Sequence, residues 1–364
     1  MLGISSTSIR STTPARREGQ VTASLRDFTV YLGKRLVGSL FVLLGVALIV
    51  FIISHVLSPN PALLWAGPKA RPETIKAVAA EYHLDQPLLN QLVYYFQSLL
   101  TGNLGTDPQT GRPILSEVMF YAPNTLELVL ASMVVIIVLG VGMGYVSGMR
   151  YGTKIDSGIR TFYLVTWSTP YYLGALVSVL VFSSYIPIFP SGGNGSVGVS
   201  YTPITGIFVL DTLLEGNWAA LQSGVYHLIL PAVTLALLSF GIVPRIMRSS
   251  ILDTRWSMHV KAAQARGLEE GEVRRKHVLR NALIDTTTVV ATTFGWLFSG
   301  TIIVEQIFAW PGIGQFSYNA IISANYPVLV ACVLVFTVGV IIANFIADIV
   351  YTILDPRITL GEGG

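Results

Sequence analysis

Charge and cysteine are both scarce in this sequence. Of its 364 residues only 12% are charged, whereas 52% are hydrophobic, and Cys332 is the single cysteine. One cysteine excludes a disulfide within the chain and any zinc site built on several cysteines. A mean hydropathy of +0.62, together with long apolar runs, indicates an all-α polytopic membrane protein rather than soluble domains.

Several catalytic motifs are also missing. The sequence has no GxxxxGK[ST] phosphate-binding loop, no HExxH zinc motif and no GxSxG nucleophile motif. We therefore expect no metal site, no cofactor and no enzymatic activity in this chain. The centres of its apolar segments carry almost no carboxylate or histidine, which argues against a proton-driven carrier. The energy for any transport should come from another protein.

Six apolar segments are long enough to cross a membrane. Residues 36–57 contain no Lys, Arg, Asp or Glu and would extend about 33 Å as a helix, enough for the hydrocarbon core. Comparable segments follow at 126–149, 159–186, 228–247, 287–308 and 328–354. The sequence therefore predicts six transmembrane helices.

Lys and Arg are distributed unevenly between the connections. Residues 1–35 carry six, 150–160 carry three and 245–280 carry nine, whereas 187–226 and 310–327 carry none. Because cytoplasmic loops are enriched in Lys and Arg, we expect both termini in the cytoplasm. The basic residues alternate by loop instead of forming one face, so the net charge of +3 does not indicate nucleic-acid binding.

The N-terminal part of the chain divides into three predicted regions. Residues 1–35 form a cytoplasmic arm, largely disordered, that ends in a short helix lying in the headgroup plane; the alternative is that this helix merely extends the first span. The first span, 36–57, leads into an ordered external region, 58–125, with a helical stretch from Glu73 to Leu100.

Residues 126–358 form the predicted five-helix core. Within it, 187–226 is rich in Gly and Ser and is expected to be mobile, and 248–282 is a cytoplasmic loop. Gly140, Gly144 and Gly148 form a GxxxGxxxG groove in which a neighbouring helix backbone can approach closely. The groove could serve static packing or a surface that slides during transport.

Ionisable residues near the ends of the spans are costly unless they are interfacial, paired or in contact with water. They are His55, His227, Asp285, Glu305 and Asp348. We expect interfacial anchoring for both histidines and Asp348, and a position at the cytoplasmic entrance of the fifth span for Asp285.

The stretch VKAAQARGLEEGEVRRKHVLRNALI, 260–284, combines basic residues with a run of small ones. The pattern predicts a short helix over Val260–Arg266, a stop at Gly267 and a second helix from Glu269 or Glu270. Acidic residues early in that second helix and basic residues after them match the helix dipole. Small side chains on a short exposed helix would let the groove of a separate ATPase close around its backbone.

These residues resemble the binding-protein-dependent ABC importer permeases, whose cytoplasmic loop carries an Ala-Ala…Gly signature. Here it reads Lys261, Ala262, Ala263, Gln264, Ala265, Arg266, Gly267 and Leu268, with Lys261 where the family typically has Glu. More narrowly, the chain resembles the first permease of the dipeptide/oligopeptide/nickel branch. Its marks are "GNLG" at 102–105, "PNTLEL" at 123–128, "RNAL" at 280–283, "VEQIFAWPGIG" at 304–314, "NYPV" at 325–328 and "LDPRI" at 354–358.

The resemblance implies a type I ABC importer permease fold in the cell membrane and a set of partners. They are a second homologous permease, two ATP-binding subunits that hold ATP and Mg, and an extracellular substrate-binding protein. It also implies that 261–268 couples this chain to the ATPase. The chain departs from the branch in its long Ser/Thr-rich arm, in an expanded 187–226 loop and in Asn325, where the branch often has Asp.

The turn that contains Trp310, Pro311, Gly312 and Gly314 is a candidate external gate or contact for the binding protein. The alternative is that Trp310 is an interfacial aromatic anchor. For the substrate, the resemblance favours di- or oligopeptides, with oligosaccharides as the alternative and nickel as a weaker one. Two other classes of function stay open: a self-sufficient secondary carrier and a membrane assembly factor without transport activity.

Overall fold

The computed structural model describes residues 15–57, 60–196 and 198–354. Most of these residues are helical, and their only β-structure is an isolated bridge between Thr106 and Pro113. Within these ranges five helices are long and apolar enough to cross a membrane, or six if one sharply bent pair of helices counts as a single span. The expectation of an all-α membrane protein is confirmed.

The chain begins with one long helix and a small helical group. They are α1 (Ala15–Phe51), a π-helical turn at Ile52–Val56, α2 (Pro61–Ala66), α3 (Pro72–Glu81) and α4 (Leu88–Leu100). Helix α1 runs without a break from Ala15 to Phe51, so residues 15–35 are continuous with the first span, and their position relative to the headgroups stays a prediction. Residues 1–14 lie outside the described part. The helical stretch predicted from Glu73 to Leu100 is interrupted at 82–87, where Pro87 precedes α4.

The second span starts twelve residues earlier than the hydropathy predicted, at Ile114 instead of Leu126. It comprises α5 (Ile114–Val135), a π-helical segment at Ile136–Val141 and α6 (Gly142–Met149). The helix therefore continues across the boundary predicted at 125, and which part of it lies in the membrane stays a prediction. The polar residues Asn124 and Thr125, which precede the predicted start, are buried inside the helix and hydrogen-bonded to other segments.

The third predicted span is not one straight helix. It is divided into α7 (Lys154–Ser168) and α8 (Tyr171–Val179), continued by a π-helical segment at Leu180–Tyr185, with a bend of 106° between the two parts. Pro170 stands at the break as the N-cap of α8. A proline disfavours helical backbone in the residue before it, which accounts for the break.

The region 187–226 contains more helix than its Gly/Ser composition predicted: α9 (Phe208–Glu215) and the start of α10 (Trp218–Ser239). Asp211 accepts hydrogen bonds from the backbone N–H groups of Ile204, Thr205 and Gly206. Glu127 of α5 accepts one from the Val209 N–H at the start of α9, 2.7 Å away. These contacts hold the loop against the helical core.

The fourth predicted span, 228–247, is displaced. The apolar helix is α10, and the chain breaks at Phe240 and Gly241 before α11 (Ile242–Arg255). A Cβ on Gly241 would lie 2.5 Å from the Trp167 Cβ, so this break requires glycine for the close approach of α7. Pro244 thereby falls in the first turn of α11, where proline is tolerated.

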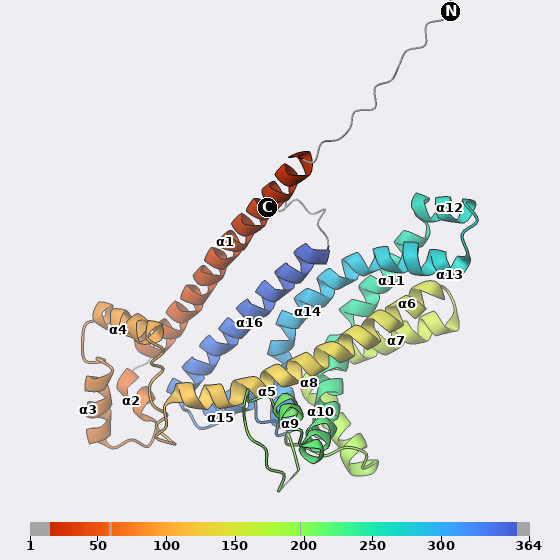
Figure 1. The fold of residues 1–364 in the computed structure, drawn as a ribbon. Helices are drawn as coiled ribbons and strands as arrows, with labels where there is room; N and C mark the ends of the chain where they lie inside the picture. Colours follow the sequence, from red (N-terminus) through yellow and green to blue (C-terminus); the bar gives the residue numbers. More distant parts are fainter. Residues whose placement is uncertain (1–14, 58–59, 197, 355–364) are drawn as a thin grey trace, which may run out of the picture.

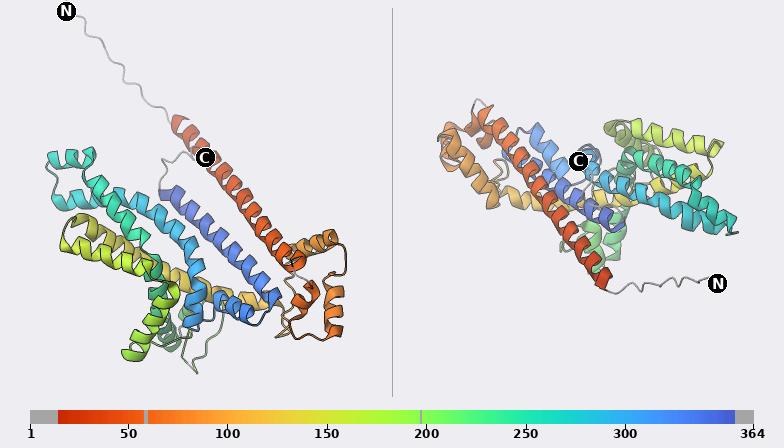
Figure 2. Two further views of the ribbon diagram at one scale, coloured as in Figure 1. Left: turned by 180° about the vertical axis from the view of Figure 1, so that it is seen from behind. Right: turned by 90° about the horizontal axis from the view of Figure 1, so that it is seen from above.

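The remaining elements follow the expected order. They are α12 (Met258–Ala265), α13 (Glu270–Glu272), a π-helical segment at Val273–Leu279, α14 (Arg280–Ile307), α15 (Ile313–Ile322) and α16 (Tyr326–Leu354). Figure 1 and the left view of Figure 2 show that the start of α1, the end of α16 and α12 lie at one end of the molecule. Helices α2, α3 and α4 lie at the opposite end.

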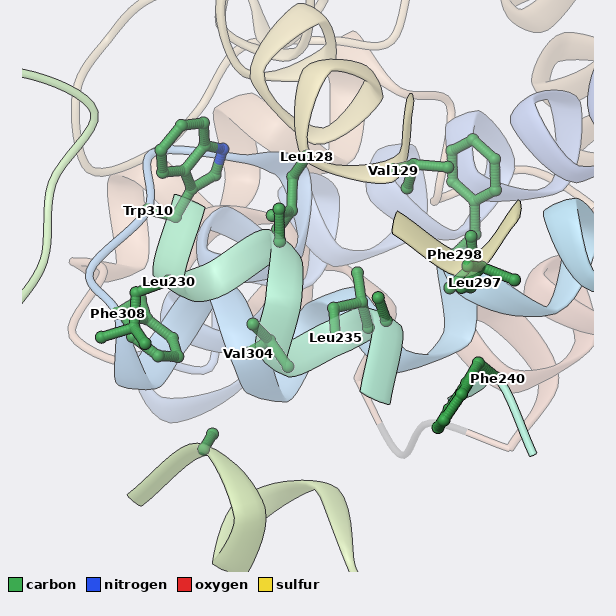
Figure 3. Close-up of a cluster of buried hydrophobic side chains, with 14 of the residues drawn as sticks. Leu128, Val129, Leu230, Leu235, Phe240, Leu297, Phe298, Val304, Phe308 and Trp310 are labelled. Carbon is green, nitrogen blue, oxygen red and sulfur yellow. The ribbon is translucent and has the colours of Figure 1, made fainter. Parts of the chain in front are cut away.

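The main hydrophobic core forms where α5, α10 and α14 meet. Leu128, Leu235 and Leu297 are fully buried there, and Phe308 and Trp310 extend the cluster beyond the end of α14 (Figure 3). Helix α1 lies outside this core, beside α16 (Figure 1). In the most apolar part of its span, only 11% of the residues are buried. Arg35 of α1 and Asp348 of α16 form an ion pair at 2.6 Å, so Asp348 is paired and is not simply an interfacial anchor.

Candidate functional site

The short helix α12 stands at the end of the molecule on a defined turn. It begins after Ser257 and ends before Gly267, whose φ of +75° places it in the left-handed region. The Gly267 N–H donates to the Gln264 carbonyl and the Leu268 N–H donates to the Ala263 carbonyl. This pair of bonds is the Schellman motif, in which glycine avoids the strain of a Cβ. The predicted stop at Gly267 is confirmed.

The two faces of α12 differ in kind. Val260 and Ala263, three residues apart, are buried against Met247 and Ile251 of α11 and against the segment that follows α13. The other face is open to solvent, and its residues are Lys261, Ala262, Gln264, Ala265, Arg266 and Gly267. Leu268 is half-buried beside the inner cluster. Ala263 therefore does not belong to an outward small-residue surface, since helical spacing turns it toward its own chain.

The second helix of the loop starts at Glu270, after Glu269 as its N-cap, which agrees with the predicted start. Glu270 pairs with Arg274, and Glu272 pairs with Lys276 at 2.7 Å, both at i,i+4 spacing. Such pairs contribute only a few tenths of a kcal/mol each at exposed positions. The two ion pairs stabilise the start of the second helix, whereas the buried contacts of Val260 and Ala263 hold α12 in position.

Polar side chains tie this loop to the long helices that continue from it. Ser250 of α11 donates to the Asp285 carboxylate of α14 at 2.8 Å. His259 of α12 lies 3.0 Å, Nε2 to Nδ2, from Asn281, and Asn281 also donates to the His277 carbonyl at 2.7 Å. A displacement of α12 would therefore act on both α11 and α14.

Helix α11 is in turn locked to the neighbouring helix pair. Arg248 makes two hydrogen bonds to Asp156 at the start of α7, at 2.8 and 3.1 Å. Asp156 is 1% exposed and also accepts from the Ser147 hydroxyl and the Gly152 N–H. The Asp156 carboxylate raises the pKa of Arg248 above its ordinary value, so the guanidinium stays charged. A bidentate pair of this kind fixes orientation as well as distance.

The predicted glycine groove is occupied by α11. A Cβ on Gly140 would lie 2.8 Å from Val243 Cγ1, one on Gly144 2.5 Å from Met247 Cβ, and one on Gly148 2.6 Å from Ile251 Cγ2. The contacts repeat every four residues on both helices, so the two backbones run closely together. Met247 and Ile251 also form the cluster under α12.

A second candidate site, the turn 304–314, is closed. The carboxylate of Glu305, fully buried, accepts from the Thr125 hydroxyl at 2.8 Å and from the Gln315 N–H at 3.1 Å. Thr125 in turn accepts from the Ile313 N–H, and the Trp310 indole donates to the Asn124 carbonyl at 2.9 Å. Two segments that the resemblance singled out, 123–128 and 304–314, thus meet in one network.

The closed turn corrects one sequence-based alternative. Trp310 is 1% exposed and lies within the main core, so its interpretation as an interfacial aromatic anchor is wrong. Gly312 and Gly314 are also buried, and Pro311 is half-buried. A Cβ on Gly314 would lie 2.7 Å from the Ile302 Cα, so the glycine allows close packing. These side chains offer little surface to a partner, and a role in an external gate stays a prediction.

The sequence analysis missed two features of the open site. Trp256, two residues before α12, and Met258, its first residue, are 68% and 78% exposed. Large apolar side chains within a polar loop were the available signal, because exposed residues of this kind are common in the centres of interfaces. The contact between His259 and Asn281 had no sequence signal, since the two residues are far apart in the chain.

Comparisons with known proteins agree with this arrangement. Residues 136–360 match the family described as binding-protein-dependent transport system inner membrane component, and 28–139 match its N-terminal companion. The chain is 34% identical to a probable D,D-dipeptide transport system permease protein of Escherichia coli strain K12, over 92% of this chain and 99% of that protein.

Two further relatives have similar coverage. A dipeptide transport system permease protein of Alkalihalophilus pseudofirmus is 34% identical over 90% of this chain and 98% of its own length. An oligopeptide transport system permease protein of Bacillus subtilis strain 168 is 30% identical, again over 90% of this chain and 98% of its own length. The chain therefore belongs to the family of inner-membrane permeases of binding-protein-dependent transport systems.

Proposed function

We propose that this chain is one of two homologous transmembrane subunits of an ATP-driven importer for di- or oligopeptides and forms half of the translocation pathway. The observation that carries the proposal is the open face of α12, a row of small and basic residues without a partner among the described residues. The peptide substrate rests on the relatives, which are named for dipeptide and oligopeptide transport.

In this proposal the open face of α12 fits a groove on one of two ATPase subunits, which bind ATP and Mg. Ala262 and Ala265 have short side chains, so a partner can approach the helix backbone. Trp256 and Met258 would add apolar area at the edge of the contact. When the ATPases close, α12 moves with them.

The motion would reach the spans by two routes. Helix α11 carries it through the glycine groove to α6 and through Arg248 and Asp156 to α7. Helix α14 carries it from Asn281 and Asp285 toward the turn at Glu305. A conformational change follows only if the contacts at α12 differ between the states of the ATPase. This requirement makes α12 the coupling element.

The same assembly fixes an orientation. One end of the molecule carries α12, the start of α1 and the end of α16, and this end faces the cytoplasm. The end that carries α2, α3 and α4 faces outward. The alternation of basic loops predicts the same orientation. The external binding protein would then dock near the α2–α4 group, and the turn at 304–314 would lie beneath it as a gate.

Purification under mild conditions tests the assembly. The full chain is isolated from its native membrane, and the proteins that accompany it are identified by mass spectrometry. We expect a second six-span permease, ATPases with a phosphate-binding loop and, in the periplasmic or external fraction, a peptide-binding protein. Isolation of this chain alone, with uptake into liposomes that does not need ATP, would contradict the proposal and favour a secondary carrier.

A further inference from the structure

A cavity of about 420 Å³ lies at the end of the molecule opposite α12, away from the coupling site and the closed turn. It is lined by His55 of the π-helical turn and by residues of α2, the end of α3, α4, the segment 103–106 and the first turns of α16. Its volume is within the range of small-molecule sites in proteins. Nothing in the coupling mechanism uses it.

Several aromatic rings line the cavity. Trp65 and Tyr82 lie 5.0 Å apart between ring centroids, His83 and Tyr94 are stacked at 3.8 Å, and Tyr95 also lines the cavity. Apolar side chains from Leu99, Val330 and Ala331 complete one side. The cavity therefore combines ring faces with a short hydrocarbon surface.

The Lys, Arg, Asp and Glu content of the wall favours a positively charged ligand. The lining contains no Lys and no Arg, and its single carboxylate is Glu81. Two unpartnered atoms can accept a hydrogen bond from an ammonium group: Gln91 Oε1 and Tyr95 Oη have no hydrogen-bond partner among the described residues, and both side chains are more than nine-tenths buried. The Trp65 Nε1–H is also without a partner, but it can only donate and so does not favour a cation. Buried polar atoms without partners are rare and costly in stable proteins.

The backbone around the cavity is held in unusual conformations. His83 has a φ of +54°, which few residues other than glycine adopt. Gly105 has a φ of +84°, and a Cβ there would lie 2.7 Å from the Tyr82 hydroxyl. The left-handed conformation of His83 is strained, and strained residues of this kind collect at ligand sites more often than elsewhere. Here it places Tyr82 and His83 in the wall.

We propose that this cavity binds a small organic cation, a protonated primary amine on an apolar chain. The ammonium group would lie against the aromatic faces and toward Glu81, because ring quadrupoles attract cations. The carbon chain would lie against Leu99 and the first turns of α16. A ligand with a phosphate or carboxylate at the same depth would meet Glu81 with no Lys or Arg side chain to compensate for it.

Two sources could supply this amine. One is the free amino end of a short peptide at the external surface, and the other is the ethanolamine headgroup of a lipid beside α16. Both present the same chemistry to the cavity. The inference does not depend on the proposed transport function, because the site can be measured by binding alone.

The test uses the full-length chain, with whatever subunits purify with it, in nanodiscs of phosphatidylglycerol. Butylamine is the probe and butanol its uncharged counterpart, and saturation-transfer NMR observes the bound ligand. We expect butylamine to bind and butanol to bind at least tenfold more weakly. Glu81→Gln should weaken butylamine binding about threefold, and Trp65→Leu should weaken it further. Glu73→Gln, in the same helix but outside the cavity, is the control and should leave it unchanged.

Equal binding of butanol and butylamine, or equal effects of Glu81→Gln and Glu73→Gln, would overturn the proposal. If Trp65→Leu fails to fold, the Glu81 and Glu73 pair still decides it. Displacement of butylamine by dialanine but not by N-acetyl-dialanine would identify a peptide amine. Displacement by phosphatidylethanolamine added to the nanodiscs would identify a lipid headgroup.

Discussion

The open face of α12 and the closed turn at 304–314 are both rich in small residues, yet they have opposite surroundings. In α12, Ala262 and Gly267 are exposed, and Gly267 serves the geometry of the chain reversal. In the turn, Gly312 and Gly314 are buried against Glu305 and Ile302. Small residues thus allow close approach in both places, but in the turn that space is filled by the chain itself, whereas at α12 it is open to solvent.

The glycine groove of α6 belongs with the closed turn, because α11 already fills it. Closed surfaces should respond to enlargement by losing stability, and the open surface by losing partner contact while the fold remains. This difference can be tested by pairs of substitutions at neighbouring or equivalent positions.

The largest effect is expected in the groove. Gly144→Leu would drive a side chain into Met247 and the Pro244 carbonyl, and the rigid α11 backbone cannot yield without losing its other contacts. We expect little folded protein, measured as monodisperse material after detergent extraction. Gly142→Leu, on the same helix with no atom within 4 Å of its Cβ, is the control and should yield normal amounts.

Trp310→Ala should follow in size. It removes a fully buried indole and leaves the Asn124 carbonyl without its donor, which costs about 3–5 kcal/mol for the lost packing. A thermal unfolding series should show a clear drop in midpoint. Trp296 is 76% exposed, so Trp296→Ala should shift the midpoint far less; similar shifts for the two variants would contradict the closed structure of the turn.

Adjacent alanines in α12 give a sharper comparison. Ala263→Glu buries a carboxylate in the cluster beneath the helix and should lower stability by about 1–3 kcal/mol or displace α12. Ala262→Glu points outward and should leave the unfolding midpoint unchanged. Uptake should nevertheless fall in both variants. A stable Ala263→Glu protein with intact uptake would mean that α12 is not seated as described.

The smallest effect concerns pH and the loop before α9. Burial alone would raise the pKa of Asp211, but hydrogen bonds from the Thr205 hydroxyl and from the backbone N–H groups of 204–206 prevail and lower it below its ordinary value. A carboxylate with a lowered folded pKa stabilises the protein above its unfolded pKa of about 3.9 and loses that contribution as the pH falls through the folded value.

Hydrogen exchange of the amides at 204–206 measures this effect. Protection should be constant near neutral pH and should fall at acid pH, after correction for the intrinsic exchange rate. In Asp211→Asn, protection should be weaker at neutral pH and should depend less on pH. An unchanged profile in that variant would show that Asp211 does not hold the loop.

The sequence predicted the all-α fold class, the order of the apolar segments, and the start and stop of α12. These features follow from hydropathy and from local capping residues. It misplaced the start of the second span, because the polar residues Asn124 and Thr125 find their partners at Trp310 and Glu305, about 180 residues away. It also missed the bend at Pro170 as a break of the third span, since proline alone does not distinguish a kink from a break.

The same limit applies to the site. Ala262 and Ala263 look alike in the sequence, and only the packing of Val260 and Met247 shows which one faces inward. Trp310 appeared equally suited to an interface and to a gate, and the structure places it in the core. Long-range packing decided each of these cases, and a single sequence carries no direct signal of it.

The most direct test of the central claim compares two glycines with the same local geometry. Gly267 after α12 and Gly216 after α9 both have left-handed backbones, with φ of +75° and +72°, and neither has an atom within 4 Å of its Cβ position. The strain of adding a side chain is therefore matched. Uptake of a labelled dipeptide and ATP hydrolysis are measured for Gly267→Trp and Gly216→Trp in the assembled importer. We predict normal membrane insertion of both, normal uptake by Gly216→Trp, and loss of uptake with hydrolysis no longer stimulated by the binding protein in Gly267→Trp. Normal coupled uptake by Gly267→Trp would contradict the assignment of α12 as the element that docks on the ATPase.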